Sequence, residues 1–263
     1  ICVFQEKNLG GLGIIKDGDL TALDQPFTVI GSLSLHGREM TYTASSPTAF
    51  TQVIVHNLDD HQQHSIKQTR DLKLDSGYLS TPQTIEFPTA KDETAHGFFY
   101  PPQNKDFKAP EGALPPLIVF MHGGPTSATH NALSLQTQFW TSRGFAIFDI
   151  NYRGSTGYGR TYRDKLMRQW GIADVEDTVF GARFLTDLQW VDGDKLAIRG
   201  GSAGGYTTLA ALAFQDIFKA GASHYGIGDL ETLARDTHKF ESRYLDSIIG
   251  PYPEDIETYR ARS

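Results

Sequence analysis

The sequence predicts an α/β protein in which a doubly wound, mostly parallel sheet follows a group of antiparallel strands. Three observations lead to this fold class. β-Branched segments alternate with turns over roughly the first 80 residues, and strands then alternate with helices. The short apolar run at residues 117–121 leads into glycines, as expected for a buried parallel strand. We therefore expect two domains, residues 1–78 and residues 79–263.

Four antiparallel strands are expected in the first domain, at residues 26–34, 39–44, 49–56 and 65–69. Polar turns separate them, and four strands over about 45 residues are the size of one propeller blade. A single blade cannot cover both of its faces, so the segment is predicted to be the last one or two blades of a β-propeller, with a small sandwich as the alternative. Gly10–Gly13 is expected to be a turn.

Strands and helices alternate through the second domain. Strands are expected at residues 83–87, 95–100, 117–121, 145–150, 195–199 and 219–225, and helices at 132–143, 172–188 and 207–213. The second helix has apolar residues at spacings of three and four, which is one face of an amphipathic helix. Its acidic residues, Asp174, Glu176, Asp177 and Asp187, are expected on the solvent-exposed face.

Composition excludes several classes of function. The 263 residues carry 24 Lys plus Arg against 31 Asp plus Glu, a net charge of −7 without a basic block, so nucleic acid is not an expected partner. The longest strongly apolar run, Leu114–Met121, is far shorter than the roughly 20 residues of a membrane span. The single cysteine, Cys2, excludes an internal disulfide framework, makes a Cys-built metal site improbable and favours a cytoplasmic location.

A serine flanked by glycines follows the strand at residues 195–199. Gly200-Gly201-Ser202-Ala203-Gly204 matches G-x-S-x-G, and a helical segment comes after it. In a nucleophile elbow the serine occupies a strained strand-to-helix turn, and the residues two before and two after it lack side chains so that strand and helix can approach. We predict that Ser202 is a nucleophile in an elbow formed by Gly200 and Gly204, with a plain tight turn as the alternative.

Such a serine needs hydrogen-bond donors for the oxyanion that forms when it attacks a carbonyl. One donor is the backbone N–H of the next residue, here Ala203. The second is expected from a loop after an earlier strand, and His122-Gly123-Gly124-Pro125 follows the strand at residues 117–121. The predicted oxyanion hole therefore consists of the amides of Gly124 and Ala203, with Gly123 as a substitute for Gly124.

These motifs resemble those of the prolyl oligopeptidase family of serine peptidases, and in particular its acylaminoacyl-peptidase-like branch. The resemblance rests on three segments in order, at residues 122–125, 151–159 and 200–205. It implies a β-propeller that caps an α/β-hydrolase domain, short peptides as substrates, and no metal or organic cofactor. Several relatives carry a tyrosine at the position of His122, so the resemblance implies that His122 is structural rather than a general base.

The family order, serine then acid then histidine, implies that the other two triad residues lie beyond Ser263. Only 61 residues follow Ser202, and the acid is expected roughly 80 residues beyond it. An internal triad of Ser202, Asp229 and His238 is the alternative, and His224 is expected to be a core or sheet-edge residue. We expect the chain, which does not begin with Met, to be a fragment that is inactive alone.

The sequence thus predicts a serine-type peptidase with a peptide substrate as its partner. It gives no oligomeric state. Arg153 and Tyr206 are candidates for substrate binding, and an ion pair with an acidic residue is the alternative for Arg153. Glu241, Arg243 and Tyr244 could line the same cleft. The competing functions are a carboxylesterase of the same fold and a non-catalytic binding module.

Overall fold

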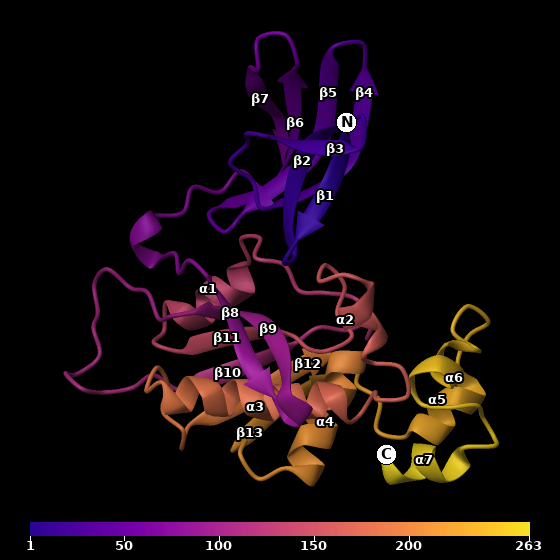
Figure 1. The fold of residues 1–263 in the computed structure, drawn as a ribbon. Coiled ribbons are helices and arrows are strands. Elements are labelled where there is room, and N and C mark those ends of the chain that lie inside the picture. The colour runs from indigo at the N-terminus through magenta and orange to yellow at the C-terminus, as the bar shows by residue number, and fades with distance from the viewer.

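The computed structural model describes residues 1–263 and contains three separate sheets (Figure 1). The first is an antiparallel sheet of β1 (Cys2–Glu6), β2 (Leu9–Lys16) and β3 (Asp19–Leu23). The second is an antiparallel sheet of β4 (Val29–His36), β5 (Glu39–Ser46), β6 (Ala49–Asn57) and β7 (Gln63–Gln68). The strands of this second sheet pair in chain order, as the meander predicted from the sequence requires.

The expectation of a turn at Gly10–Gly13 is wrong, because these residues lie in the middle of β2. Glycine is needed here for packing: a Cβ added to Gly11 would lie 2.4 Å from the ring of Phe4 on the neighbouring strand β1. A run of glycines that is typical of a turn therefore serves as a flat surface on which an aromatic side chain packs.

The third sheet has six strands in the order β13-β12-β10-β11-β9-β8. Its strands are β8 (Gln83–Thr89), β9 (Glu93–Tyr100), β10 (Leu117–Met121), β11 (Ala146–Asn151), β12 (Leu196–Gly201) and β13 (Ala220–His224). The four strands from β10 to β13 pair in parallel, whereas β8 and β9 form an antiparallel hairpin that extends the sheet beyond β11. The six strands agree with those expected from the sequence to within a few residues.

Seven helices accompany this sheet. They are α1 (Leu135–Thr141), α2 (Arg160–Asp164), α3 (Ala173–Asp187), α4 (Ala203–Phe214), α5 (Leu230–Asp236), α6 (Tyr244–Ile248) and α7 (Ile256–Ala261). The first is shorter than residues 132–143, because the hydroxyl of Ser134 accepts from the Thr137 N–H and begins the helix there. Figure 1 shows α5, α6 and α7 gathered beside one end of the sheet.

Side chains of the central strands alternate between two apolar layers. Leu117, Val119 and Met121 of β10 face the main core, which the helices α3 and α4 cover. Ile118 and Phe120 point to the other face, where they join a smaller cluster against which Trp140 of α1 packs. A sheet covered on both faces by helices explains why its strands are continuous apolar runs.

The prediction that the acidic residues of α3 face solvent is wrong for two of them. Asp174 and Asp177 are completely buried, and only Asp187 at the end of the helix is exposed. Asp174 accepts from the Gly171 N–H at 2.7 Å and from the Thr207 hydroxyl at 2.6 Å. Gly171 is close in sequence to Asp174, but Thr207 is 33 residues away, so the helical pattern alone gives no sign of this burial.

Asp177 forms a buried ion pair with Arg153. Its carboxylate accepts from the Arg153 Nε at 2.9 Å, from the Arg153 backbone N–H at 2.6 Å and from the Thr89 hydroxyl at 2.6 Å. Glu176 completes the cluster, because it accepts from the Arg153 guanidinium at 2.7 Å. The cluster ties α3 to the segment that follows β11.

The first sheet contacts the loops at the carboxyl ends of the parallel strands through Asn8, in the turn between β1 and β2. The Asn8 N–H donates to the Gly157 carbonyl at 3.0 Å, and its side-chain amide donates to the Thr129 carbonyl at 2.5 Å. Asn8 is 1% exposed and has a φ of 60°, a conformation that asparagine tolerates better than most residues. This turn therefore anchors the antiparallel sheets against the loops around residues 129 and 157.

Replacement of Asp177 by Asn tests the contribution of the buried ion pair to stability. The substitution keeps the shape but leaves the buried Arg153 charge without its main partner, so we expect the free energy of unfolding to fall by about 3 kcal/mol. Asp187→Asn on the same helix is the matched control, with an expected change within about 0.5 kcal/mol. Urea unfolding of both variants measures the difference, and equal losses would contradict the assignment.

Candidate active site

Ser202 occupies the sharp turn between β12 and α4. Its φ of 55° and ψ of −122° place it in a region that L-residues rarely adopt, and its side chain is exposed. The Ser202 N–H donates to the His224 carbonyl of the edge strand β13 at 3.0 Å, which fixes the turn from one side. A strained backbone that lifts a hydroxyl out of the strand is the geometry expected of a nucleophile elbow.

The glycines around Ser202 are required by the crossing of strand and helix. A Cβ on Gly204 would lie 2.2 Å from the carbonyl oxygen of Met121 at the end of β10, and one on Gly200 would lie 2.3 Å from the carbonyl oxygen of Gly204. Both neighbours are backbone atoms, which cannot rotate away as a side chain can. Only glycine therefore fits at these two positions, as the sequence predicts.

The loop after β10 lies directly against the elbow. A Cβ added to Gly123 would be 3.5 Å from the Cβ of Ser202 and 3.2 Å from the Gly201 carbonyl oxygen. The backbone N–H groups of Gly124 and Ala203 donate to no other backbone group, and Ala203 is the first residue of α4, where helical N–H groups have no partner. The loop after β10 and the first residue of α4 thus lie next to Ser202, and the amides of Gly124 and Ala203 remain the candidates for the oxyanion hole.

Three side chains hold this loop. The His122 ring contacts the Gly123 carbonyl oxygen through Nδ1 and the Ser155 hydroxyl through Nε2, both at 2.8 Å, and it stacks on Tyr152 with ring centroids 4.3 Å apart. The Tyr152 hydroxyl donates to the Pro125 carbonyl at 2.9 Å. Burial lowers the pKa of His122 to about 4, so the imidazole is neutral at pH 7.

Tyr244 supports the same loop from α6. Its hydroxyl lies 2.6 Å from the Thr126 hydroxyl and accepts from the Thr126 N–H at 3.2 Å. The sequence suggests Tyr244 only as one of three residues near the cleft, whereas the structure shows its contact with the oxyanion loop. Of the other two, Arg243 pairs with Asp246 at 2.8 Å.

The two candidates for substrate binding have internal contacts instead. Arg153 is 4% exposed, and its guanidinium pairs with Asp177 and Glu176, which is the alternative that the sequence left open. Tyr206 is 2% exposed, packs against Trp170 with ring centroids 4.7 Å apart, and donates its hydroxyl to the Arg262 carbonyl at 2.8 Å. Both side chains are occupied in holding the fold together, because the loop after β11 and the start of α4 turn them inward.

No histidine ring contacts the Ser202 hydroxyl. Asp229 accepts from the Thr232 N–H at 3.0 Å and caps α5, while His238 is exposed beside Glu241. His224 is exposed at the sheet edge, with its Nε2 3.1 Å from the Arg199 guanidinium. These contacts give Asp229 and His238 local roles on the surface and do not connect them with Ser202.

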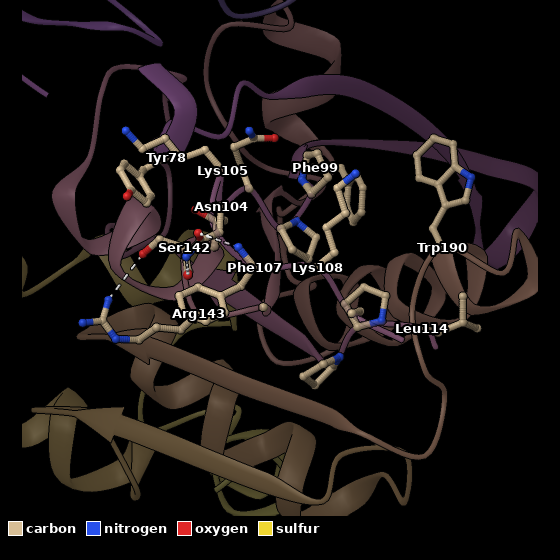
Figure 2. A pocket seen from close by; sticks show the side chains of 18 of the residues that line it. Tyr78, Phe99, Asn104, Lys105, Phe107, Lys108, Leu114, Ser142, Arg143 and Trp190 are labelled. Atoms are coloured by element: carbon tan, nitrogen blue, oxygen red, sulfur yellow. Dashed lines mark hydrogen bonds between the residues drawn. The ribbon is translucent and has the colours of Figure 1, made fainter. Parts of the chain in front are cut away.

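A groove lies at the end of the sheet where the parallel strands begin, and Figure 2 shows Ser142 and Trp190 among the side chains that line it. It measures about 1400 Å³, and Pro115, Ser142 and Trp190 line it from the segments that precede β10, β11 and β12. Ligands of open α/β sheets bind outside the carboxyl ends of the strands, where Ser202 lies. The groove is therefore separate from the site that contains the serine.

The family model of the prolyl oligopeptidase family matches residues 131–263, half of the chain, including the elbow. The chain belongs to the prolyl oligopeptidase family. This confirms the resemblance that the three sequence motifs indicate.

Solved structures of the family share the fold along almost the whole chain. A puromycin-hydrolyzing peptidase of Mycobacterium tuberculosis is 40% identical, with a TM-score of 0.95 over 98% of this chain. The acylaminoacyl peptidase of Pyrococcus horikoshii is 25% identical, with a TM-score of 0.83 over 99% of this chain. The six-stranded sheet and its helices are thus an α/β-hydrolase fold.

The chain corresponds to only part of these relatives. It spans 40% of the mycobacterial structure and 41% of the archaeal one. Dipeptidyl aminopeptidase BIII of Pseudoxanthomonas mexicana is 28% identical over 67% of this chain, which is 26% of that enzyme. None of the helices in the structure has the length and apolar character needed to span a membrane.

Replacement of Gly204 by Ala tests the close approach at the elbow. The added methyl group overlaps the carbonyl oxygens of Met121 and His122, so we expect a loss of about 1–3 kcal/mol in the free energy of unfolding. Gly228→Ala is the control, because no atom lies within 4 Å of a Cβ at that position. Thermal unfolding of both variants measures the effect, and a Gly204→Ala protein as stable as the control would show that strand and helix are not in contact here.

Proposed function

We propose that the protein containing this chain is a serine-type peptidase that hydrolyses short peptides through an acyl-enzyme on Ser202. The observation that carries the proposal is the strained, exposed Ser202 beside two backbone N–H groups that have no backbone partner. The names of the relatives, which include a puromycin-hydrolyzing peptidase and acylaminoacyl peptidases, support peptide-like amides as substrates.

In the proposed reaction the Ser202 hydroxyl loses its proton to a histidine and its oxygen attacks the scissile carbonyl. The N–H groups of Gly124 and Ala203 donate to the oxyanion of the tetrahedral intermediate. The C–N bond then breaks, the histidine returns its proton to the leaving amine, and the acyl group remains on Ser202. Water, activated by the same histidine, releases the acid and restores the serine.

We propose that the histidine and the carboxylate that orients it follow Ser263 in the longer protein. Two observations support this: no imidazole in the 263 residues contacts Ser202, and the relatives are more than twice as long as this chain. His122 is unsuitable as the base, because both of its nitrogens already make hydrogen bonds.

We further propose that residues 1–78 are the end of a β-propeller and residues 79–263 the catalytic domain. The four-stranded antiparallel sheet β4–β7 has the strand order of one blade. It contacts a loop that follows β10, because the Leu133 N–H donates to the Ser46 carbonyl of β5 at 2.8 Å. A propeller in this place would limit access to short peptides. It also argues against the stand-alone carboxylesterase, which has no such domain.

Fluorophosphonate labelling of Ser202 tests the proposed nucleophile. We expect the full-length protein to be labelled and to hydrolyse a blocked peptide amide, and Ser202→Ala to abolish both, with a loss of at least about 10⁴-fold in kcat. Ser142→Ala is the control, because Ser142 lines the groove at the other end of the sheet and its hydroxyl donates to the Phe139 carbonyl at 3.3 Å. Labelling that persists in Ser202→Ala would refute the assignment.

The activity of the isolated 263-residue chain shows whether the general base lies within these residues or outside them. We expect it to turn over peptides and esters poorly, because its Ser202 has no base. Efficient turnover by a verified 263-residue preparation, lost in Ser202→Ala, would show that a base lies within the chain. A full-length protein that cleaves short-chain esters much faster than peptide amides would favour the carboxylesterase.

A further inference from the structure

The proposed oxyanion donor at Gly124 belongs to one rigid unit, the peptide group between Gly123 and Gly124. The Gly123 carbonyl and the Gly124 N–H lie in the same plane and point in opposite directions, because the peptide bond is planar and trans. Whatever fixes the direction of the Gly123 carbonyl therefore also fixes the direction of the Gly124 N–H. A loop with two adjacent glycines has little intrinsic preference of its own, so this direction must be imposed by a contact.

That contact is made by His122. Its Nδ1 lies 2.8 Å from the Gly123 carbonyl oxygen. A carbonyl oxygen can only accept, so Nδ1 carries the proton. Burial lowers the pKa of the imidazole to about 4, so at pH 7 the ring has one proton and Nε2 is an acceptor. The Ser155 hydroxyl, 2.8 Å from Nε2, must then be the donor.

The ring cannot easily rotate out of this arrangement. It stacks on Tyr152 with an interplanar angle of 14°, and the Tyr152 hydroxyl holds the Pro125 carbonyl at the other end of the loop. Ser155 is itself completely buried, and its N–H donates to the Tyr152 carbonyl at 2.9 Å. The two hydrogen bonds and the stack leave the imidazole one orientation and one tautomer.

We propose that His122 is a positioning residue, which as a neutral Nδ1–H imidazole, held by the Ser155 hydroxyl, pins the Gly123 carbonyl so that the Gly124 N–H points at the oxyanion. This inference rests on the proposed peptidase function. It gives His122 and Ser155 a role in stabilising the transition state although neither touches the substrate. The hydrogen bond from the Gly124 N–H is made to the oxyanion, which exists only in the transition state and intermediate. Misplacing this N–H therefore lowers kcat more than it weakens substrate binding.

Two substitutions test whether the hydrogen bond donated by Nδ1 matters, or only the volume of the ring. In His122→Asn the side-chain NH₂ occupies the place of Nδ1 and can still donate to the Gly123 carbonyl, whereas in His122→Gln the amide occupies the place of Nε2 and cannot. In the full-length protein we expect His122→Gln to lower kcat by about 10²–10³-fold, as the loss of one oxyanion donor does. We expect His122→Asn to stay within about tenfold of the natural protein and KM to change by less than about threefold in both.

Ser155→Ala and His130→Gln complete the kinetic series. Ser155→Ala leaves the ring in place but removes the donor to Nε2, and we expect a loss of about tenfold in kcat. His130 is exposed on the neighbouring segment, and we expect His130→Gln to keep the full rate. Binding of a peptide aldehyde, which forms an oxyanion on Ser202, should weaken in parallel with kcat, while binding of the product acid should not. Equal losses in His122→Asn and His122→Gln, or no loss in either, would overturn the proposal.

A spectroscopic measurement of the His122 tautomer tests this inference independently of the proposed peptidase function. The ¹⁵N shifts of the His122 ring, assigned by comparison with His122→Asn, should show a neutral Nδ1–H imidazole throughout pH 6 to 8. A protonated ring or an Nε2–H tautomer would overturn the inference even in an active enzyme. If the full-length protein has no hydrolysis that depends on Ser202, the proposed function fails, and the tautomer still decides whether His122 holds the loop.

Discussion

The geometry of the site depends on the contact between the backbone of α4 and the end of β10. Gly204 lies so close to the Met121 carbonyl that not even a methyl group fits between them. This approach places the first turn of α4 against the end of β10, and Ser202 connects β12 to the helix with a φ of 55°. It also brings the loop after β10 beside the serine. One backbone contact thus produces both the exposed nucleophile and the neighbouring amides.

The buried charges of α3 stabilise the segment after β11, which carries Ser155 and contacts the oxyanion loop through His122. Asp177 accepts from both the backbone and the side chain of Arg153, which fixes the segment that follows β11. Ser155 lies two residues further along this segment and contacts His122. Burying an ion pair is costly, and replacing it by apolar residues is often neutral or stabilising. The role of the ion pair here is to position Ser155, and through Ser155 and His122 the oxyanion loop.

The sequence predicts the features that depend on local pattern. Short apolar runs that end in glycine identify β10 and β12, and G-x-S-x-G between a strand and a helix identifies the elbow, because each glycine has a steric reason that can be stated without the structure. The hydrogen-bonded meander β4–β7 follows from its alternating residues and turns. These elements need no knowledge of which distant segments meet.

Features that depend on distant partners are not visible in the sequence. Asp174 and Asp177 look like surface residues until Thr207, Arg153 and Thr89 are brought to them. Gly10–Gly13 looks like a turn because nothing local indicates that the Phe4 ring lies on it.

Tyr206 shows the same limit at the site itself. It is four residues from the nucleophile in the first turns of α4, yet that turn of the helix points its side chain to Trp170 in the core. Nearness in sequence to a catalytic residue is therefore a poor guide to the direction of a side chain on a helix.

A histidine that supports the oxyanion loop and a histidine that acts as the general base need opposite properties. His122 therefore cannot serve as the base as well. A general base needs a free lone pair and a pKa near the working pH. His122 has a pKa of about 4, its Nδ1 proton is directed to a carbonyl, and its Nε2 lone pair is directed to Ser155. These properties make it a rigid support and a weak base. An enzyme of this design therefore needs a second imidazole, and the exposed face of Ser202 is the side from which one must approach.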